Sequence, residues 1–176
     1  MNLNEILIAE LRQEAASTRK ILKQVPTEHL DWRPHEKSFT LSRMASHVAE
    51  LSHFATLALT TDELDMVATP LTRHTCTSNE EIIALFDGRI AEALKALEGI
   101  TNEQLMETWT LRAGDRVISS SSRLESIRSW MANHQIHHRG QLSVYLRLLD
   151  VPIPGMYGPS ADDRIAMEKA QATANN

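Results

Sequence analysis

Residues 122–149 have the sequence SRLESIRSWMANHQIHHRGQLSVYLRLL, and the spacing of the apolar side chains in this stretch decides the fold. Apolar residues recur every three or four positions, which places them on one face of an α-helix. We therefore predict one long helix over residues 122–149. The predicted buried seam of this helix consists of Leu124, Ile127, Met131, His134, His138, Leu142, Tyr145 and Leu149.

The same periodicity predicts two helices in the first third of the chain. Residues 4–24 carry a single apolar stripe. Pro26 ends this helix, because proline has no amide hydrogen for a helical hydrogen bond. After a polar stretch, Ser38 or Thr40 caps a second helix that extends to about Thr60.

A third helix and two shorter elements follow. Ser78, with Glu81 three residues later, has the pattern of a capping box and begins a helix that ends at Gly99. Residues 109–119 alternate loosely in polarity, which indicates a short hairpin or extended excursion before the last long helix. Ser160 caps a short terminal helix, and the Asn-rich last residues are expected to fray. Four helices of similar length predict an all-α fold, a four-helix bundle.

Length and composition narrow the class of protein. The 176 residues are 42% hydrophobic, which is enough to bury a core, so we expect residues 1–176 to form a single domain. A net charge of -5 argues against nucleic acid as a partner. Cys76 is the only cysteine, so an internal disulfide and a cysteine-based zinc motif are excluded. No apolar stretch approaches the length of a membrane span and no basic signal region begins the chain, so we expect a cytoplasmic protein.

Three of the eight histidines fall on predicted core stripes. His134 and His138 lie four residues apart on the seam of the last helix, one turn from each other. His47 lies on the stripe of the second helix, whereas His53 and His137 lie off these stripes. The stripe of the second helix consists of Thr40, Met44, His47, Leu51, Phe54 and Ala58.

Inward-facing imidazoles are costly to bury unless each has a partner. One shared divalent metal ion would satisfy all three and would leave a coordination position for water or substrate. Imidazole ligands favour zinc or nickel, and manganese and iron are compatible with them. The alternative is that these histidines are hydrogen-bonded core or interface residues without a metal, because an H-x-x-x-H pair is by itself a weak motif.

Four short segments carry a resemblance to a known family. They are residues 30–34 (LDWRP), 46–51 (SHVAEL), 133–142 (NHQIHHRGQL) and 151–160 (VPIPGMYGPS). In this order and at these separations they resemble the DinB family of damage-inducible-type helical bundle proteins. The resemblance spans nearly the whole chain. It implies a four-helix bundle with one metal ion held by His47, His134 and His138.

The resemblance implies a class of activity without a substrate. Some relatives are metal-dependent transferases or isomerases that use a low-molecular-weight thiol. We therefore expect a metal-dependent transferase or hydrolase that acts on small molecules, with such a thiol as a candidate co-substrate. The alternative is a non-catalytic, metal-binding dimeric sensor or scaffold. No residue is assigned a catalytic role.

Residues close to the histidines have simple structural interpretations. Glu50, three residues after His47, is expected to be solvated, and the alternative is that it accepts an imidazole N–H. Arg139 is expected to form a pair at a helix or subunit surface. Relatives are commonly dimers, and an outer row of the last helix is apolar beyond what a bundle needs, so we expect a homodimer. This row consists of Trp130, Val144 and Leu148.

Overall fold

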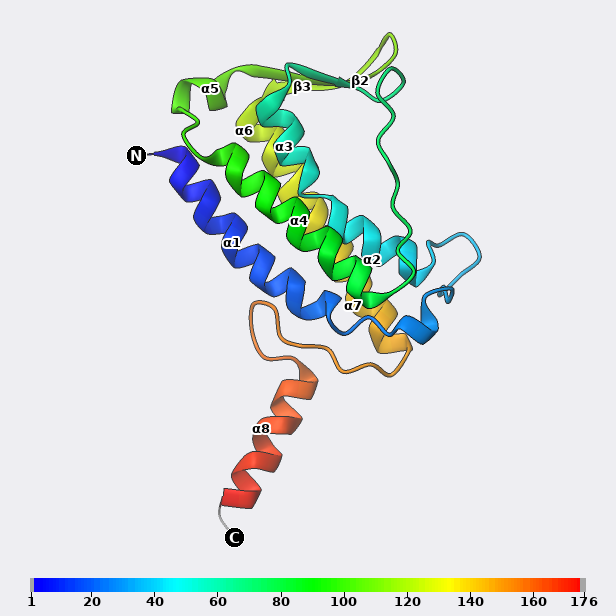
Figure 1. The fold of residues 1–176 in the computed structure, drawn as a ribbon. Helices are drawn as coiled ribbons and strands as arrows, with labels where there is room; N and C mark the ends of the chain where they lie inside the picture. The colour runs from blue at the N-terminus through cyan, green and yellow to red at the C-terminus, as the bar shows by residue number, and fades with distance from the viewer. Residues whose placement is uncertain (1, 175–176) are drawn as a thin grey trace.

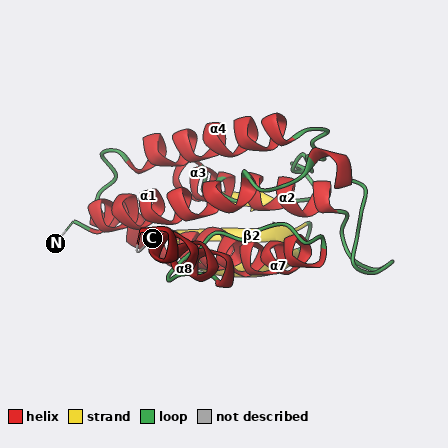
Figure 2. Cartoon of the chain, turned by 90° about the horizontal axis from the view of Figure 1, so that it is seen from below, coloured by secondary structure: helices red, strands yellow, loops and turns green. Residues whose placement is uncertain are grey.

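The predicted four-helix bundle is present in the computed structural model, which describes residues 2–174 (Figure 1). Helix α4 packs on α1, α2 and α3, while α2 also packs on α7. Viewed from below, α1 lies between α4 and the layer that contains α7 (Figure 2). The helices of the bundle are α1 (Leu3–Leu22), α2 (Leu41–Glu50), α3 (His53–Thr60), α4 (Asn79–Leu97), α6 (Arg123–Ser126), η2 (Ile127–Asn133) and α7 (His134–Leu148).

Local sequence explains where α4 begins and ends. The hydroxyl of Ser78 accepts a hydrogen bond from the amide of Glu81 at the start of α4, as predicted. Gly99, just beyond the end of α4, has a φ of 76°, which favours glycine over residues with a Cβ. The short helices outside the bundle are η1 (Thr27–His29) and α5 (Asn102–Met106).

The second predicted helix is broken into α2 and α3, so the prediction of one continuous helix to Thr60 was wrong. The buried amide of Gln135, on α7, donates hydrogen bonds to the Val48 carbonyl (3.1 Å) and the Ser52 hydroxyl (3.3 Å). In a continuous α-helix the Val48 carbonyl would accept from the Ser52 amide. A side chain from another helix therefore stabilises the break.

The last long segment contains a π-helical stretch that the apolar spacing did not predict. α6, η2 and α7 follow one another over residues 123–148, close to the predicted length, and η2 is the π-helical part. A π-helix has i→i+5 hydrogen bonds, so it changes the rotation of the residues that follow it. His134 and His138 are consequently half-buried at the edge of the buried face instead of at its centre. The buried residues of α7 are Gln135, Arg139, Leu142, Tyr145 and Leu146.

The excursion before the last helix is a hairpin, which confirms that part of the prediction. β2 (Thr108–Ala113) pairs antiparallel with β3 (Arg116–Ser122), and Gly114 lies in the turn with a φ of 58°. The sequence did not reveal a third strand, β1 (Glu63–Asp65), which pairs parallel with β2. The sheet order is β1-β2-β3, and the small sheet covers one end of the bundle (Figure 1).

Arg139 lies inside the bundle, so the expectation of a surface pair was wrong. Its side chain is only 3% exposed and its guanidinium lies 2.7 Å from the carboxylate of Glu14 on α1. It also donates hydrogen bonds to the hydroxyls of Thr18 and Tyr157. These contacts join α1, α7 and the segment that precedes the last helix, and they remove the penalty of burying an unpaired charge.

The terminal helix α8 (Ala161–Ala174) is longer than predicted and projects away from the bundle (Figure 1). The hydroxyl of Ser160 accepts a hydrogen bond from the amide of Asp163, as expected of a cap. None of its described residues is buried. The predicted fraying of the Asn-rich end falls in part on residues 175–176, which lie outside the described residues. Within residues 2–174, no helix has the length and hydrophobicity needed to cross a membrane.

Candidate metal centre

His47, His134 and His138 come together from α2 and α7. One side-chain nitrogen from each ring lies within 4.8 Å of the other two. The ring centroids are 4.5 Å apart for His47 and His138, 5.2 Å for His47 and His134, and 4.7 Å for His134 and His138. The structure therefore brings together the three histidines that the sequence analysis selected.

The orientation of His47 is set by residues of its own helix. Its Nδ1 lies 3.2 Å from the Oε1 atom of Glu50 and 3.3 Å from the guanidinium of Arg43. If Nδ1–H donates to the carboxylate, Nε2 is left with a free lone pair that faces the other two rings. Glu50 is thus a partner of the imidazole, and the expectation that it would be solvated was wrong.

Glu50 remains ionised despite its burial. Burial raises the pKa of its carboxyl, but hydrogen bonds from His47, the His74 backbone and Arg43 together outweigh burial and lower the pKa. The Arg43 guanidinium lies 2.6 Å from Oε1, and the His74 amide donates to Oε2 at 3.0 Å. A carboxylate held by this many donors is a poor general base, and its role is to orient His47.

A second polar partner orients His138, and the sequence analysis did not identify it. The Nδ1 atom of His138 lies 2.7 Å from the side-chain oxygen of Gln141. An amide oxygen only accepts hydrogen bonds, so Nδ1 carries the proton and Nε2 presents a lone pair, which lies 2.9 Å from Nε2 of His134. Gln141 follows His138 by three residues, the same spacing as Glu50 after His47. This repeated spacing on a helix was a usable sequence signal.

The rings of His134 and His138 disfavour an additional proton. Burial lowers the pKa of His138 to about 4, against the opposing effect of its hydrogen bond to Gln141, and the nearby rings of His47 and His134 lower it further. Burial also lowers the pKa of His134, and His47 adds to this shift while the Trp130 backbone opposes it. Neutral imidazoles with free lone pairs are what a divalent metal ion requires.

The donor set therefore fits a metal ion. One nitrogen from each of the three imidazoles lies close enough to the other two to share one ion, and Glu50 and Gln141 contact the Nδ1 atoms of His47 and His138. Such a set suits zinc, nickel, copper or iron and supplies three of the four positions of a tetrahedral site. The cluster can hold a metal ion with a position open to a further ligand.

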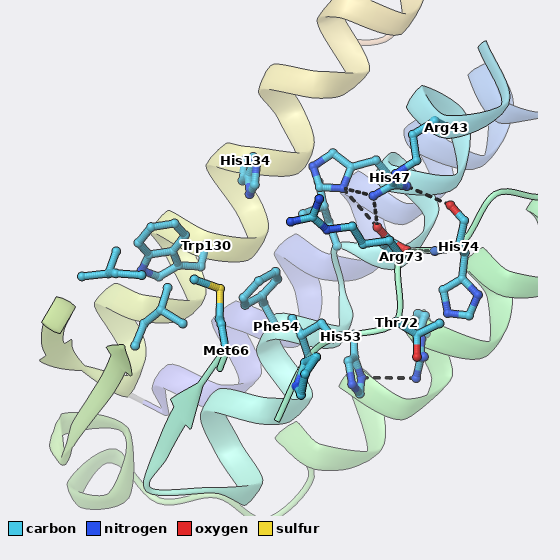
Figure 3. A pocket seen from close by; sticks show the side chains of 17 residues that line it. Arg43, His47, His53, Phe54, Met66, Thr72, Arg73, His74, Trp130 and His134 are labelled. Atoms are coloured by element: carbon cyan, nitrogen blue, oxygen red, sulfur yellow. Dashed lines mark hydrogen bonds and ion pairs between the residues drawn. The ribbon is translucent and has the colours of Figure 1, made fainter. Parts of the chain in front are cut away.

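A cavity of about 630 Å³ adjoins the cluster (Figure 3). His47 and His134 line it, together with residues of α3, α4, η2 and the sheet. The segment between β1 and α4 supplies one wall, from Met66 to His74. Trp130 also faces this cavity, so it is not part of an outer apolar row. His53 lines the cavity near Arg89, whereas His137 is exposed.

A helical bundle with a histidine triad beside a small-molecule-sized cavity defines the class of this protein. The profile of the DinB family matches residues 1–169. The chain belongs to the DinB family, and the resemblance noted in the sequence is confirmed.

Known proteins agree with this assignment. The chain is 25% identical to the uncharacterized protein YrdA of Bacillus subtilis strain 168 over 154 residues, 85% of each chain. A DinB-like protein from Bacillus cereus ATCC 10987 has a similar structure, with a TM-score of 0.63 and 23% identity over 83% of this chain and 92% of that chain. YfiT from Bacillus subtilis, described as a probable metal-dependent hydrolase with an unusual four-helix bundle topology, gives a TM-score of 0.60 and 16% identity. That comparison covers 84% of this chain and 87% of YfiT. At these identities the structural likeness shows the fold.

Proposed function

We propose that this chain is a metal-dependent enzyme that hydrolyses a small molecule or transfers a low-molecular-weight thiol to one. The observation that carries the proposal is that two of the three clustered imidazoles, His47 and His134, also line the cavity. A metal ion on the cluster would therefore face a space large enough for a substrate. The description of YfiT as a probable metal-dependent hydrolase supports this choice.

In this proposal His47, His134 and His138 hold one divalent ion, with zinc or nickel favoured over manganese or iron. A divalent ion lowers the pKa of a coordinated water or thiol and so supplies a nucleophile near neutral pH. Glu50 and Gln141 keep the Nδ1 protons of their histidines in place, so that the Nε2 atoms stay available. Apolar cavity residues such as Phe54 and Trp130 limit the access of bulk water to the reacting groups.

The test uses protein purified without a histidine tag, stripped with chelator and reloaded with zinc, nickel, manganese and iron in turn. We expect hydrolysis of simple esters or amides, or conjugation of a small thiol to an electrophile, that disappears with chelator. His47→Ala should abolish both metal binding and turnover while the helical circular dichroism survives. His137→Ala, which removes an exposed histidine next to the cluster, is the matched control.

A folded, metal-loaded protein that turns over no thiol, ester or amide would contradict the enzyme proposal. It would instead support the alternative of a non-catalytic metal-binding sensor or scaffold. Metal content measured on the same samples separates this outcome from simple loss of the ion.

We also propose that the protein is a homodimer. Val144 and Leu148 on α7 are 58% and 57% exposed, and Ile165 and Met167 on α8 are at least half exposed. Apolar side chains exposed on two helices of this kind favour association with a second chain. A dimer would bury surface that α8, which projects from the bundle, leaves open in one chain (Figure 1).

A further inference from the structure

The cavity beside the histidine cluster has a cationic side and an apolar side (Figure 3). In that view Trp130, Phe54 and Met66 lie on one side, and Arg73 and His74 lie on the other. The two sides come from different parts of the fold. The cationic side is formed by α2, α4 and the segment before α4, and the apolar side by α3, η2 and the sheet.

Positive charge exceeds negative charge on the cationic side. Arg43, Arg73 and Arg89 line the cavity, and Glu50 is the one carboxylate among its described lining residues. Both oxygens of Glu50 are already engaged, Oε1 by Arg43 at 2.6 Å and Oε2 by the backbone amide of His74 at 3.0 Å. Glu50 therefore neutralises Arg43 and leaves Arg73 and Arg89 without a carboxylate inside the cavity.

The two remaining arginines are poorly neutralised from outside. Arg89 lies 2.8 Å from Glu92, but the Glu92 side chain is 48% exposed, so solvent screens the pair. Arg89 also contacts the Nδ1 of His53 at 3.3 Å. Within residues 2–174, Arg73 forms no ion pair. Guanidinium groups in this state are suited to a carboxylate or a phosphate, which they bind through paired hydrogen bonds.

The opposite side of the cavity is formed mainly by apolar side chains. The rings of Phe54 and Trp130 lie 6.4 Å apart between centroids and are tilted by 30°. Met66 and Ile118 line the same space and are each 37% exposed. Exposed apolar side chains in a concave site favour an apolar ligand group, and a cavity of about 630 Å³ matches a small molecule.

We propose that this cavity binds a small amphipathic anion. The positive charge of Arg73 and Arg89 attracts its carboxylate or phosphate head, and its apolar part packs against Phe54 and Trp130. His47 and His134 line the same cavity, so a ligand bound there would lie close to the histidine cluster. The assignment of this anion as substrate rests on the proposed function, whereas its binding by the arginines does not.

The binding test is calorimetry on chelator-treated protein with four probes of equal chain length: hexanoate, hexyl phosphate, hexanol and hexylamine. A carboxylate can also bind directly to a metal ion, so metal-free protein isolates the contribution of the arginines. We expect both anions, or one of them, to bind about tenfold more tightly than the alcohol and the amine. Whichever anion binds more tightly identifies the head group.

Variants locate the binding. Arg73→Gln and Arg89→Gln should each weaken binding of the preferred anion about tenfold. Arg12→Gln removes the same charge from an exposed position on α1 and should leave affinity unchanged. Trp130→Ala should weaken binding of hexyl phosphate and leave that of inorganic phosphate unaffected. Arg73 forms no ion pair among the described residues, so its variant keeps the test valid if Arg89→Gln fails to fold.

The results separate this inference from the proposed function. Equal affinity for hexanol and the anions, or unchanged affinity in folded Arg73→Gln and Arg89→Gln proteins, would overturn the inference even if metal binds and turnover is seen. Arginine-dependent anion binding in a protein that binds no metal would support the binding site and refute the proposed catalysis.

Discussion

The Nε2 atoms of His134 and His138 lie 2.9 Å apart across one turn of α7. Two nitrogen lone pairs at this separation repel each other unless a proton or a metal ion lies between them. Burial lowers the pKa of both rings, and the ring of His47 lowers both further. A second proton on either ring is therefore disfavoured. In the metal-free chain a neutral His134 can donate its single Nε2 proton to His138, and a bound metal ion would take the place of this proton.

Replacement of His138 should remove the metal, and replacement of His137 should not. We expect about one divalent ion per chain in the wild type, and a loss of metal affinity of more than about 100-fold in His138→Ala. His137→Ala should keep its metal, because His137 lies outside the cluster. Elemental analysis and zinc titration measure both. Equal losses in the two variants would show that the ligand assignment is wrong.

Removal of the Gln141 side-chain oxygen should weaken the metal site without unfolding the chain. Gln141 is exposed, but its oxygen holds the Nδ1 proton of His138. We expect Gln141→Ala to lower metal affinity by about tenfold, the range found for hydrogen-bond partners of metal ligands. Asn133→Ala, an exposed position on the same helical segment, is the control. Unchanged metal affinity in Gln141→Ala would mean that the Nδ1 proton of His138 needs no hydrogen-bond partner.

Metal-free protein should lose stability as the pH falls from about 6.5 toward about 4. The pKa of His138 is about 4 in the folded chain and 6.5 in the unfolded chain, so only the unfolded chain takes up this proton in that window. The free energy of unfolding therefore falls with falling pH. Urea unfolding in the presence of chelator at pH 7, 5.5 and 4.5 measures it. In His138→Gln the free energy of unfolding should depend less steeply on pH. The same slope as in the wild type would show that His138 is not the source of the pH dependence.

The buried pair of Arg139 and Glu14 should be costly to break from one side. Arg139→Met leaves the Glu14 carboxylate, whose side chain is 13% exposed, without its partner. We expect a loss of about 3 kcal/mol in the free energy of unfolding. The double variant with Glu14→Leu should recover much of this loss, because no unpaired charge remains buried. Urea unfolding measures these free energies. A double variant whose loss equals the sum of the two single losses would argue against coupling between the two residues.

Light scattering tests the proposed dimer. We expect a mass near twice the 19.8 kDa of one chain at micromolar concentration. Leu148→Glu places a charge on the exposed apolar surface of α7 and should shift the protein toward one chain. The same substitution at exposed Ile6 on α1 is a control for added charge. A wild-type mass near that of a single chain would rule out the proposal.

Much of the fold and of the site was predictable because both depend on helical periodicity. The apolar spacing located the four bundle segments, and the same spacing grouped His47 with His134 and His138. Polarity alternation in residues 109–119 indicated the hairpin. These signals are local, since each depends on residues a few positions apart. The expectation of a single domain over residues 1–176 stays a prediction.

The features that sequence analysis missed depend on contacts between distant segments. The break between α2 and α3 needs Gln135, which follows Val48 by 87 residues. The three residues of β1 form a strand only because β2 lies beside them. Arg73, on the segment before α4, reaches the histidines' cavity only in the folded chain. Periodicity within a helix carries no information on such contacts.

The segment between β1 and α4 supplies part of the cavity wall from outside the helices that carry the histidines. The histidines lie on helices that also build the core, whereas Arg73 and His74 lie on a connecting segment outside those helices. Insertions and substitutions are tolerated far better in such segments than in packed helices. Substitution of side chains within residues 66–74 can therefore alter which molecule is recognised, provided that the backbone amide of His74 keeps its bond to Glu50.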